Sequence, residues 1–406
     1  MPLLTVDSPN TTRVFGRGPY QTSVAATQLV FGRRSNAVIL ASVEQPLDAM
    51  AALSLVHQPI DGPVLLGSPE GIDPVVRDEI RRLAPMGAEG LAQVIIVGAL
   101  GDAVEQQVAS LGFSVMRLAG MNAYHTAAEI ARFLGYPGDI MLLSGEHPLS
   151  GLCAGAMAVH GGVPVLFTLK DTLPQETAGA IQASGDAANV FIVGGRDLVS
   201  DNVEAAVRDL TSGTVGRISA EDLFDLAVKF AKYRSSDGRF GFGKTEKQGH
   251  AFTFVNPAKW QDAISGALLA HMGKHAPVLF CRRDDLPTVV RDYLLRVNPA
   301  QGRPEPPFMH AFIVGDFDAI SPSVQLDIDD TISIDRKADH EVVHTVAPGD
   351  SLLRIARRYG VLIRDIASAN QLSAEAGLKP GSRLLIPYTV IGAPPTPPAP
   401  PAQELH

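Results

Sequence analysis

Four short sequence features recur three times in the same order along the chain, and this internal repetition limits the possible folds more than any other property. The first feature is a ten-residue opening phrase that begins with arginine, at 13–22, 117–126 and 217–226. A short apolar run, an Ala-rich stretch that leads into a second apolar run, and a last apolar run before a glycine follow each opening. The openings are 104 and then 100 residues apart, so one unit of this length is written three times.

The apolar runs predict buried strands. The last run of each copy, at 94–97, 190–193 and 311–314, contains only apolar residues. Runs without polar alternation are typical of strands that helices cover on both faces in a parallel sheet. The segments 22–31 and 126–134 between the runs have helical spacing. Each copy is therefore predicted to be a small α/β sandwich with a parallel sheet and right-handed crossovers.

The repeated phrases resemble the cell-wall-binding repeat 2 family, whose modules open with Arg-Ile-x-Gly-x-Asp-Arg-Tyr-x-Thr-Ala and continue through an Asp-Ala-Leu helix and a Pro-x-Leu-Leu strand to an Ile-x-Gly-Gly turn. The likeness covers residues 13–335. It implies three modules packed around a pseudo-threefold axis, at 13–116, 117–216 and 217–336, after a leader at 1–12. In that family the modules hold surface proteins to anionic polymers of the bacterial wall, so the resemblance implies a wall polymer as a partner.

The opening phrases supply the candidate residues for binding such a polymer, namely Arg13, Arg17, Tyr20, Arg117, Tyr124 and Arg217. Cationic side chains would attract an anionic polymer, although the formal net charge of the chain is -9. A second interpretation is structural, with the arginine of each opening holding a strand end or a module interface. The Asp-Arg pair of the family is replaced by Gly18-Pro19 in the first copy and by Asn122-Ala123 in the second, and the third keeps only Asp222.

The sequence changes character after residue 336. Residues 344–360 predict a strand, a Pro-Gly turn and a capped helix, 361–370 a second short helix, and 378–387 a turn before a last strand. This βααβ order over 337–390 resembles a LysM domain. LysM domains bind N-acetylglucosamine-containing glycans such as peptidoglycan, so the resemblance implies a glycan partner. A Pro-rich tail at 391–406 is predicted to be extended and disordered.

The LysM resemblance places the glycan groove between two loops. Backbone hydrogen bonds to acetamido groups and apolar contact with the sugar ring would hold the glycan there. The Pro-Gly pairs could also serve only to build tight turns, and both interpretations are compatible because turns position the amides. The first loop consists of Ala347, Pro348, Gly349, Asp350, Ser351 and Leu352, and the second of Leu378, Lys379, Pro380, Gly381 and Ser382.

Two motifs match catalytic patterns in the wrong context. Residues 238–245 match the phosphate-loop pattern, which needs a strand before it and a helix after it, whereas here a helix precedes and a strand follows. They lie in an insertion of the third copy, 234–250, for which an exposed hairpin or loop is predicted. His340 and His344 match the zinc-protease pattern, but on a strand they stand ~13 Å apart and cannot share a metal. We therefore predict no catalytic residue, metal or cofactor.

Composition excludes several classes of partner. The 34 Lys and Arg against 43 Asp and Glu give the wrong sign for a nucleic-acid backbone. The longest uncharged run, 149–169, contains His160 and Pro164 and predicts helix, turn and buried strand, so we expect no membrane span. The N-terminus lacks the apolar stretch of a secretory signal. A cytoplasmic location therefore stays an alternative to the cell wall that the resemblance implies.

These observations predict a non-catalytic cell-envelope protein that attaches to wall polymer through its modules and to peptidoglycan-type glycan through the LysM domain. Two weak sites on one chain reinforce each other through effective concentration. The first alternative is a self-associating structural or docking subunit of a large cytosolic or phage-tail-like assembly, which the acidic body and the lost Asp-Arg pairs favour. The second alternative is an enzyme acting on wall glycan, which requires paired carboxylates in a cleft.

Overall fold

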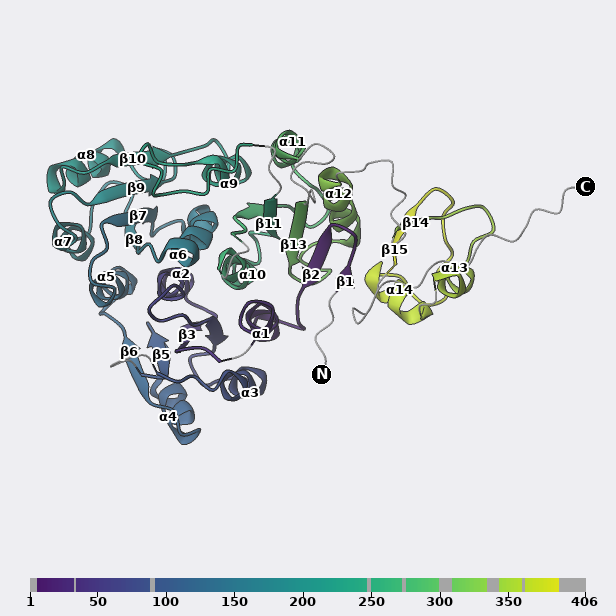
Figure 1. Ribbon diagram of the computed structural model, residues 1–406, viewed down its shortest axis with the longest axis horizontal. Coiled ribbons are helices and arrows are strands. Elements are labelled where there is room, and N and C mark those ends of the chain that lie inside the picture. Colours follow the sequence, from purple (N-terminus) through teal and green to yellow (C-terminus); the bar gives the residue numbers. More distant parts are fainter. Residues whose placement is uncertain are drawn as a thin grey trace, which may run out of the picture.

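The computed structural model describes residues 6–32, 34–87, 92–246, 250–271, 275–298, 309–333, 343–359 and 362–386. These residues form a body of three α/β modules with a smaller domain beside it (Figure 1). The prediction of three parallel-sheet α/β modules followed by a small βααβ domain is confirmed. No helix of the described residues is long and apolar enough to cross a membrane.

The three sheets share one strand order. Module 1 has the order β4-β3-β5-β6, from β3 (Val38–Ser42), β4 (Val64–Gly67), β5 (Val94–Val97) and β6 (Val115–Leu118). Module 2 has the order β8-β7-β9-β10, from β7 (Asp139–Ser144), β8 (Val165–Thr168), β9 (Asn189–Val193) and β10 (Val215–Ile218). Module 3 has the order β12-β11-β13-β2-β1, from β1 (Val6–Asp7), β2 (Thr11–Val14), β11 (His250–Val255), β12 (Val278–Phe280) and β13 (Met309–Val314). All pairings are parallel except that of β1 with β2.

Helices connect and cover the strands of each copy. The first copy contains α1 (Pro19–Val30), α2 (Pro46–Ala52), η1 (Leu53–Leu55), α3 (Pro74–Leu83) and α4 (Asp102–Ser110). The second contains α5 (Ala123–Phe133), η2 (Pro148–Ala154), α6 (Gly155–Gly161), α7 (Gln175–Ala183) and α8 (Asp201–Leu210). The third contains α9 (Leu223–Lys232), α10 (Trp260–Ala267), η3 (Leu268–Ala270), α11 (Thr288–Val297) and α12 (Pro322–Ile332). Short polar side chains start several of them, since Asp73, Asn122 and Asp222 accept hydrogen bonds from free amides of α3, α5 and α9.

The strand that opens each copy pairs with the sheet of a neighbouring module. β6, which opens the second copy, pairs with β5 of module 1, and β10, which opens the third, pairs with β9 of module 2. The first opening strand, β2, pairs with β13 of module 3, while the helix after it, α1, packs on β4 of module 1. Each opening segment therefore links two modules, and β2 closes the three modules into a ring.

The opening arginines fasten these linking strands. Nη1 of Arg13 donates hydrogen bonds to the carbonyl oxygens of Gly315 (3.0 Å) and Ile320 (2.8 Å), and Nε donates to Oε1 of Gln325 (2.7 Å). The same arrangement recurs in the other two copies. Arg117 donates hydrogen bonds to the carbonyl oxygens of Gly98 and Leu100 and forms an ion pair with Glu105. Arg217 donates to the carbonyl oxygens of Gly194 and Val199 and forms an ion pair with Glu204. Each arginine thus holds the turn that follows the central strand of the neighbouring sheet.

Helices from all three copies meet at the centre of the body. α2, α6 and α10 lie there in Figure 1, and α6 contacts both η1 and α10. Small residues allow the close approach, because a Cβ on Gly155 of α6 would lie 2.6 Å from Leu53 of η1 and 3.6 Å from Ala267 of α10. The Ala-rich stretches of the sequence therefore form the shared core on the pseudo-threefold axis.

The prediction that the insertion 234–250 is an exposed hairpin or loop is wrong for its aromatic residues. Phe240 is 1% exposed and stacks on Phe191 of module 2, with ring centroids 3.8 Å apart. Phe242 is buried and stacks on His160 at the end of α6. The glycine-rich segment is a loop, but its aromatic side chains fasten module 3 to module 2.

The smaller domain consists of β14 (Val343–Thr345), α13 (Leu352–Tyr359), α14 (Ile363–Ala369) and β15 (Arg383–Leu385). β14 and β15 pair in an antiparallel sheet. The domain has its own apolar core, formed by Val346, Leu352, Ile355, Ala356, Ile366, Ala367, Leu384 and Ile386. It lies beside module 3, next to α12, β2 and β1 (Figure 1).

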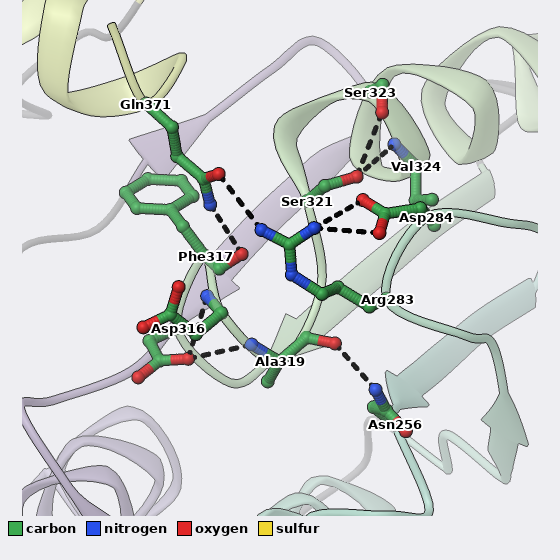
Figure 2. A network of polar contacts seen from close by, with 11 residues as sticks. Asn256, Arg283, Asp284, Asp316, Phe317, Ala319, Ser321, Ser323, Val324 and Gln371 are labelled. Atoms are coloured by element: carbon green, nitrogen blue, oxygen red, sulfur yellow. Dashed lines mark hydrogen bonds and ion pairs between the residues drawn. The ribbon is translucent and has the colours of Figure 1, made fainter. Parts of the chain in front are cut away.

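The smaller domain packs on module 3 through a defined interface. Leu326 of α12, Ala369 and Leu385 form a buried apolar cluster, against which Phe317 packs. Nε2 of Gln371 donates to the carbonyl oxygen of Phe317 (2.6 Å), and Nη2 of Arg283 donates to Oε1 of Gln371 (3.2 Å), as Figure 2 shows. Arg383 forms an ion pair with Asp330 of α12. These contacts fix the orientation of the domain on the body.

Replacing Arg13 tests the ring closure. Arg13 has no exposed surface, so Arg13→Met leaves the carbonyls of Gly315 and Ile320 buried without their donor. We expect the free energy of unfolding to fall by about 3 kcal/mol or more, measured by urea denaturation of the full chain. Arg17→Met is the matched control, because Arg17 is exposed, and it should change stability by less than about 0.5 kcal/mol. Equal losses in the two variants would contradict the role of Arg13.

The β2–β13 pair also predicts a pH dependence of stability. Burial lowers the pKa of His310 on β13 to about 4, and its Nε2 lies 3.1 Å from Oγ1 of Thr12 on β2. Below pH ~6.5 His310 becomes protonated in the unfolded chain but stays neutral in the folded chain until the pH approaches 4. The free energy of unfolding therefore falls by about 3 kcal/mol as the pH is lowered from 6.5 to 4. His310→Gln should lose less stability than the parent over this range in urea titrations. If the free energy of unfolding depends on pH in the same way in both proteins, His310 is not the source of the pH dependence.

Candidate functional site

A cavity of about 530 Å³ opens at the carboxyl ends of the module 2 strands. It lies beyond β7 and β9, whose outer neighbours, β8 and β10, extend the sheet in opposite directions. Such a switch point in a parallel sheet is where open α/β folds bind ligands. The lining residues are Glu146, His147, Pro148, Leu149, Ser150, Gly195, Asp197, Leu198, Ala220, Glu221, Asp222, Leu223 and Leu226. We call this cavity the module 2 crevice.

One wall of the crevice is the turn after β7. Oγ of Ser144 accepts a hydrogen bond from the amide of His147 (3.2 Å), and Oε2 of Glu146 accepts one from the amide of Lys170 (2.6 Å). Gly145 between them lets Tyr124 lie close to the turn, because an added Cβ would stand 2.4 Å from the tyrosine hydroxyl oxygen. Burial and the nearby Glu146 carboxylate raise the pKa of Tyr124. The turn is therefore held rigidly by its own contacts.

The opposite wall combines the turn after β9 with the start of α9. Arg217 holds this turn through the carbonyl of Gly194, and Oδ1 of Asp222 caps α9 by accepting the amides of Phe224 (2.8 Å) and Asp225 (2.9 Å). Asp197 and Glu221 lie exposed on this wall. The crevice is therefore built between module 2 and the opening segment of the third copy.

Carboxylates and apolar side chains dominate the crevice. Four carboxylates line it, those of Glu146, Asp197, Glu221 and Asp222, and none of its described lining residues is Lys or Arg. Leu149 lines it while 39% exposed. Carboxylates accept hydrogen bonds from hydroxyl and ammonium groups and repel phosphate. The arrangement therefore suits a neutral or amino-bearing sugar better than a polyanion.

Modules 1 and 3 have different side chains at the carboxyl edge of the sheet, where module 2 has Tyr124. In module 1 Tyr20 lies beside Ser68, and burial raises the pKa of Tyr20. In module 3 Phe224 takes the place of the tyrosine, and the guanidinium of Arg282 lies 4.4 Å from its ring centroid. An aromatic residue thus marks the carboxyl edge of every sheet, but its polar surroundings differ.

The six residues predicted to bind a wall polymer do not lie together in the structure. Arg13, Arg117 and Arg217 lie on strands of three different sheets and use their donors within the fold. Tyr20 and Tyr124 lie at the carboxyl edges of modules 1 and 2, and Arg17 is exposed before α1.

Sequence reasoning did not select Glu146, Asp197 or Glu221. The available signal was their position directly after buried strands or beside the opening phrase of the third copy.

The two predicted glycan-binding loops of the smaller domain lie side by side. The amide of Val346 donates to the carbonyl of Ser382 (2.8 Å), and the amide of Gly381 donates to the carbonyl of Val346 (2.8 Å). Oδ2 of Asp350 accepts hydrogen bonds from Nε2 of His344 (2.7 Å) and the amide of Ala347 (2.8 Å).

Most residues of these loops are available to a ligand. Pro348, Gly349, Ser351, Lys379, Pro380 and Gly381 are exposed. Leu352, in contrast, belongs to the core of the domain. The loops therefore form a preorganised surface whose turn geometry is fixed by backbone hydrogen bonds.

The catalytic-looking motifs have the expected context where the structure describes them. The segment with Lys244 is followed by strand β11, and the hydroxyl of Tyr293 donates to the carbonyl oxygen of Lys244 (2.8 Å). His344 lies on β14, whereas His340 lies outside the described residues. Cys153 and Cys281 are buried, and burial raises the pKa of each thiol to about 12.

Comparison with known protein families agrees with this architecture. The model of cell wall binding domain 2 (CWB2) matches residues 117–204 and 217–325, and the LysM domain model matches residues 344–387. The first copy, outside the CWB2 match, has the same strand order as the second.

Among curated relatives, the chain is 28% identical to N-acetylmuramoyl-L-alanine amidase LytC of Bacillus subtilis, over 66% of this chain and 49% of that protein. It is 25% identical to the amidase enhancer of the same organism, over 69% of this chain and 36% of that protein. The chain thus spans half or less of the length of these relatives.

Two solved structures have the same fold. Cwp8 from Clostridium difficile matches 80% of this chain and 52% of its own, with a TM-score of 0.66 and 21% identity. Cwp6 from the same organism matches 76% of this chain and 46% of its own, with a TM-score of 0.65 and 20% identity. The family matches show that the chain carries cell wall binding domain 2 modules at 117–204 and 217–325, followed by a LysM domain at 344–387.

Proposed function

We propose that the protein is a non-catalytic cell-envelope protein that binds wall glycan at two places, the module 2 crevice and the LysM loops. The observation that carries the proposal is the presence of both kinds of wall-binding domain in one chain. The chain shares its matched region with an amidase and an amidase enhancer, but covers only 49% and 36% of them. We assign binding, and no bond cleavage, to the shared region.

The crevice favours a particular class of wall polymer. Its carboxylates would accept hydrogen bonds from sugar hydroxyls and from amino groups, while Leu149 and Leu198 offer an apolar face to a sugar ring. An unshielded phosphate would meet four carboxylates and no lysine or arginine among the described lining residues. We therefore propose neutral or amino-bearing sugar units as the ligand of the modules.

The LysM loops would bind N-acetylglucosamine units of peptidoglycan. Their exposed turn residues present backbone groups, and the hydrogen bonds of Val346 to Gly381 and Ser382 hold the two loops in place before a ligand arrives. Preorganised loops lose little conformational entropy on binding.

Contacts between the LysM domain and module 3 strengthen the case for joint binding. The ion pair of Arg383 with Asp330 and the hydrogen bonds of Gln371 hold the LysM domain on the body. Two weak sites held at a fixed separation bind a polymeric surface more tightly than either alone when their spacing matches the polymer. A protein that binds wall glycan in this way would be retained at the cell wall.

Charge reversal in the crevice tests the proposed ligand. Glu221→Lys places a cation in the crevice and should weaken sedimentation of the full chain with purified cell walls by about fivefold, because it repels amino groups and removes an acceptor. Asp186→Lys is the matched control, since Asp186 is exposed in the loop before β9, at the opposite edge of the sheet. Stronger binding by Glu221→Lys alone would show that the polymer is anionic and overturn this assignment.

A glycine substitution tests the LysM loops. Gly381 has a φ of 86° and no atom within 4 Å of an added Cβ, so Gly381→Val strains the turn without a steric clash. We expect the full chain to bind purified peptidoglycan about tenfold more weakly, because the strain displaces the loop amides. Gly377→Val is the control, because an added Cβ there also meets nothing and its backbone is unstrained. Unchanged binding by Gly381→Val would remove these loops from the site.

A further inference from the structure

A histidine lies at each of the three seams between modules. A proline directly precedes β4, β8 and β12, and the residue two positions before that proline has a positive φ in every copy. These equivalent residues are Asp61 (43°), Gly162 (63°) and His275 (47°). Nε2 of His271 lies 3.0 Å from Oδ1 of Asp61, between modules 3 and 1. His57 of the first copy packs on Gly162 of the second.

The third seam, between modules 2 and 3, joins two imidazoles directly. Nδ1 of His160, at the end of α6, lies 3.1 Å from Nδ1 of His275, in the segment between η3 and β12. The two rings are nearly perpendicular, at 89°, with centroids 4.7 Å apart. Phe242 stacks on His160 and fixes the plane of its ring. His275 is exposed, so water and ions can reach the pair.

This separation of the nitrogen atoms matches the edge of a metal coordination polyhedron. Zinc binds histidine nitrogen at ~2.0–2.1 Å with tetrahedral geometry, which puts two ligand nitrogens ~3.3 Å apart. The observed 3.1 Å needs only a small opening of the pair. A metal ligand must be a neutral imidazole.

We propose that His160 and His275 form a binding site for a divalent metal ion that prefers imidazole nitrogen, such as Zn²⁺. The ion would take one Nδ1 from each ring and complete its coordination with water, because the described residues contain no group of three or more His, Cys, Asp or Glu that could hold a metal. Since one ligand belongs to α6 and the other to the third copy, the bound ion fastens module 2 to module 3.

The charges around the pair set the strength of this site. The Lys244 ammonium lies close enough to both imidazoles to act on them electrostatically. The same positive charge of Lys244 opposes a bound cation. The site is therefore expected to be weak in the parent protein and stronger when this charge is removed.

Metal titration of the full, untagged chain tests the proposal. Zn²⁺ should raise the thermal unfolding midpoint in a saturable way that EDTA reverses, whereas Mg²⁺, which prefers oxygen ligands, should not. His275→Gln and His160→Gln should each weaken zinc binding, followed by calorimetry, by about tenfold or more. Lys244→Gln should tighten it. Because His275 is exposed, its variant is expected to fold as the parent does.

His57→Gln is the matched control, because it removes a neighbouring imidazole and leaves the pair intact. It should keep the zinc-dependent rise of the unfolding midpoint. An equal response to zinc in the parent and in His275→Gln, or no response in the parent, would overturn the proposal and leave the pair as a hydrogen bond between neutral imidazoles.

Discussion

The pairing of β2 with β13 is the constraint on which the rest of the body depends. It brings the start of the chain against the last parallel strand of the third copy, some three hundred residues later, and makes the three modules a closed ring. The buried guanidinium of Arg13 fixes this pairing by binding the turn after β13. The pairing also positions α1, which follows β2 and contacts α10 of the third copy. The shared core and the seam between modules 3 and 1 follow from this closure.

Much of this fold could be predicted from the sequence because the signals are local and repeated. The four-residue apolar runs 94–97 and 190–193 predict buried strands, and both segments form parallel strands in the structure. The Pro-Gly turns likewise indicate the βααβ order of the LysM domain. The sheet that each opening strand joins could not be predicted. The strand with Arg117 opens the second copy but pairs with β5 of the first, and nothing local distinguishes the two choices. The repeat boundary and the sheet boundary therefore differ by one strand.

The candidate site shows a similar division. Tyr20 and Tyr124 stood out because they repeat, and they do lie at the carboxyl edges of two sheets. Glu146 and Glu221 come from different copies and form one crevice only after the chain has folded, so no spacing rule could join them. The prediction that the insertion 234–250 is exposed rested on its composition and was wrong for Phe240 and Phe242. Its glycines and polar residues suggest exposure, but a single stacking contact of Phe240 on Phe191 outweighs them.

Ring closure also fixes how many copies the chain can contain. In a solenoid each repeat contacts only its neighbours, so duplication or deletion lengthens or shortens the array without disturbing the rest. Here the first opening strand has one acceptor, the edge of the last sheet, and the small residue Gly155 fits a centre shared by three copies. A fourth copy would leave that strand without its partner and open the centre. Evolution of this architecture is therefore expected to change the surfaces of the copies and to append domains outside the ring, where the LysM domain lies, while the number of copies stays at three.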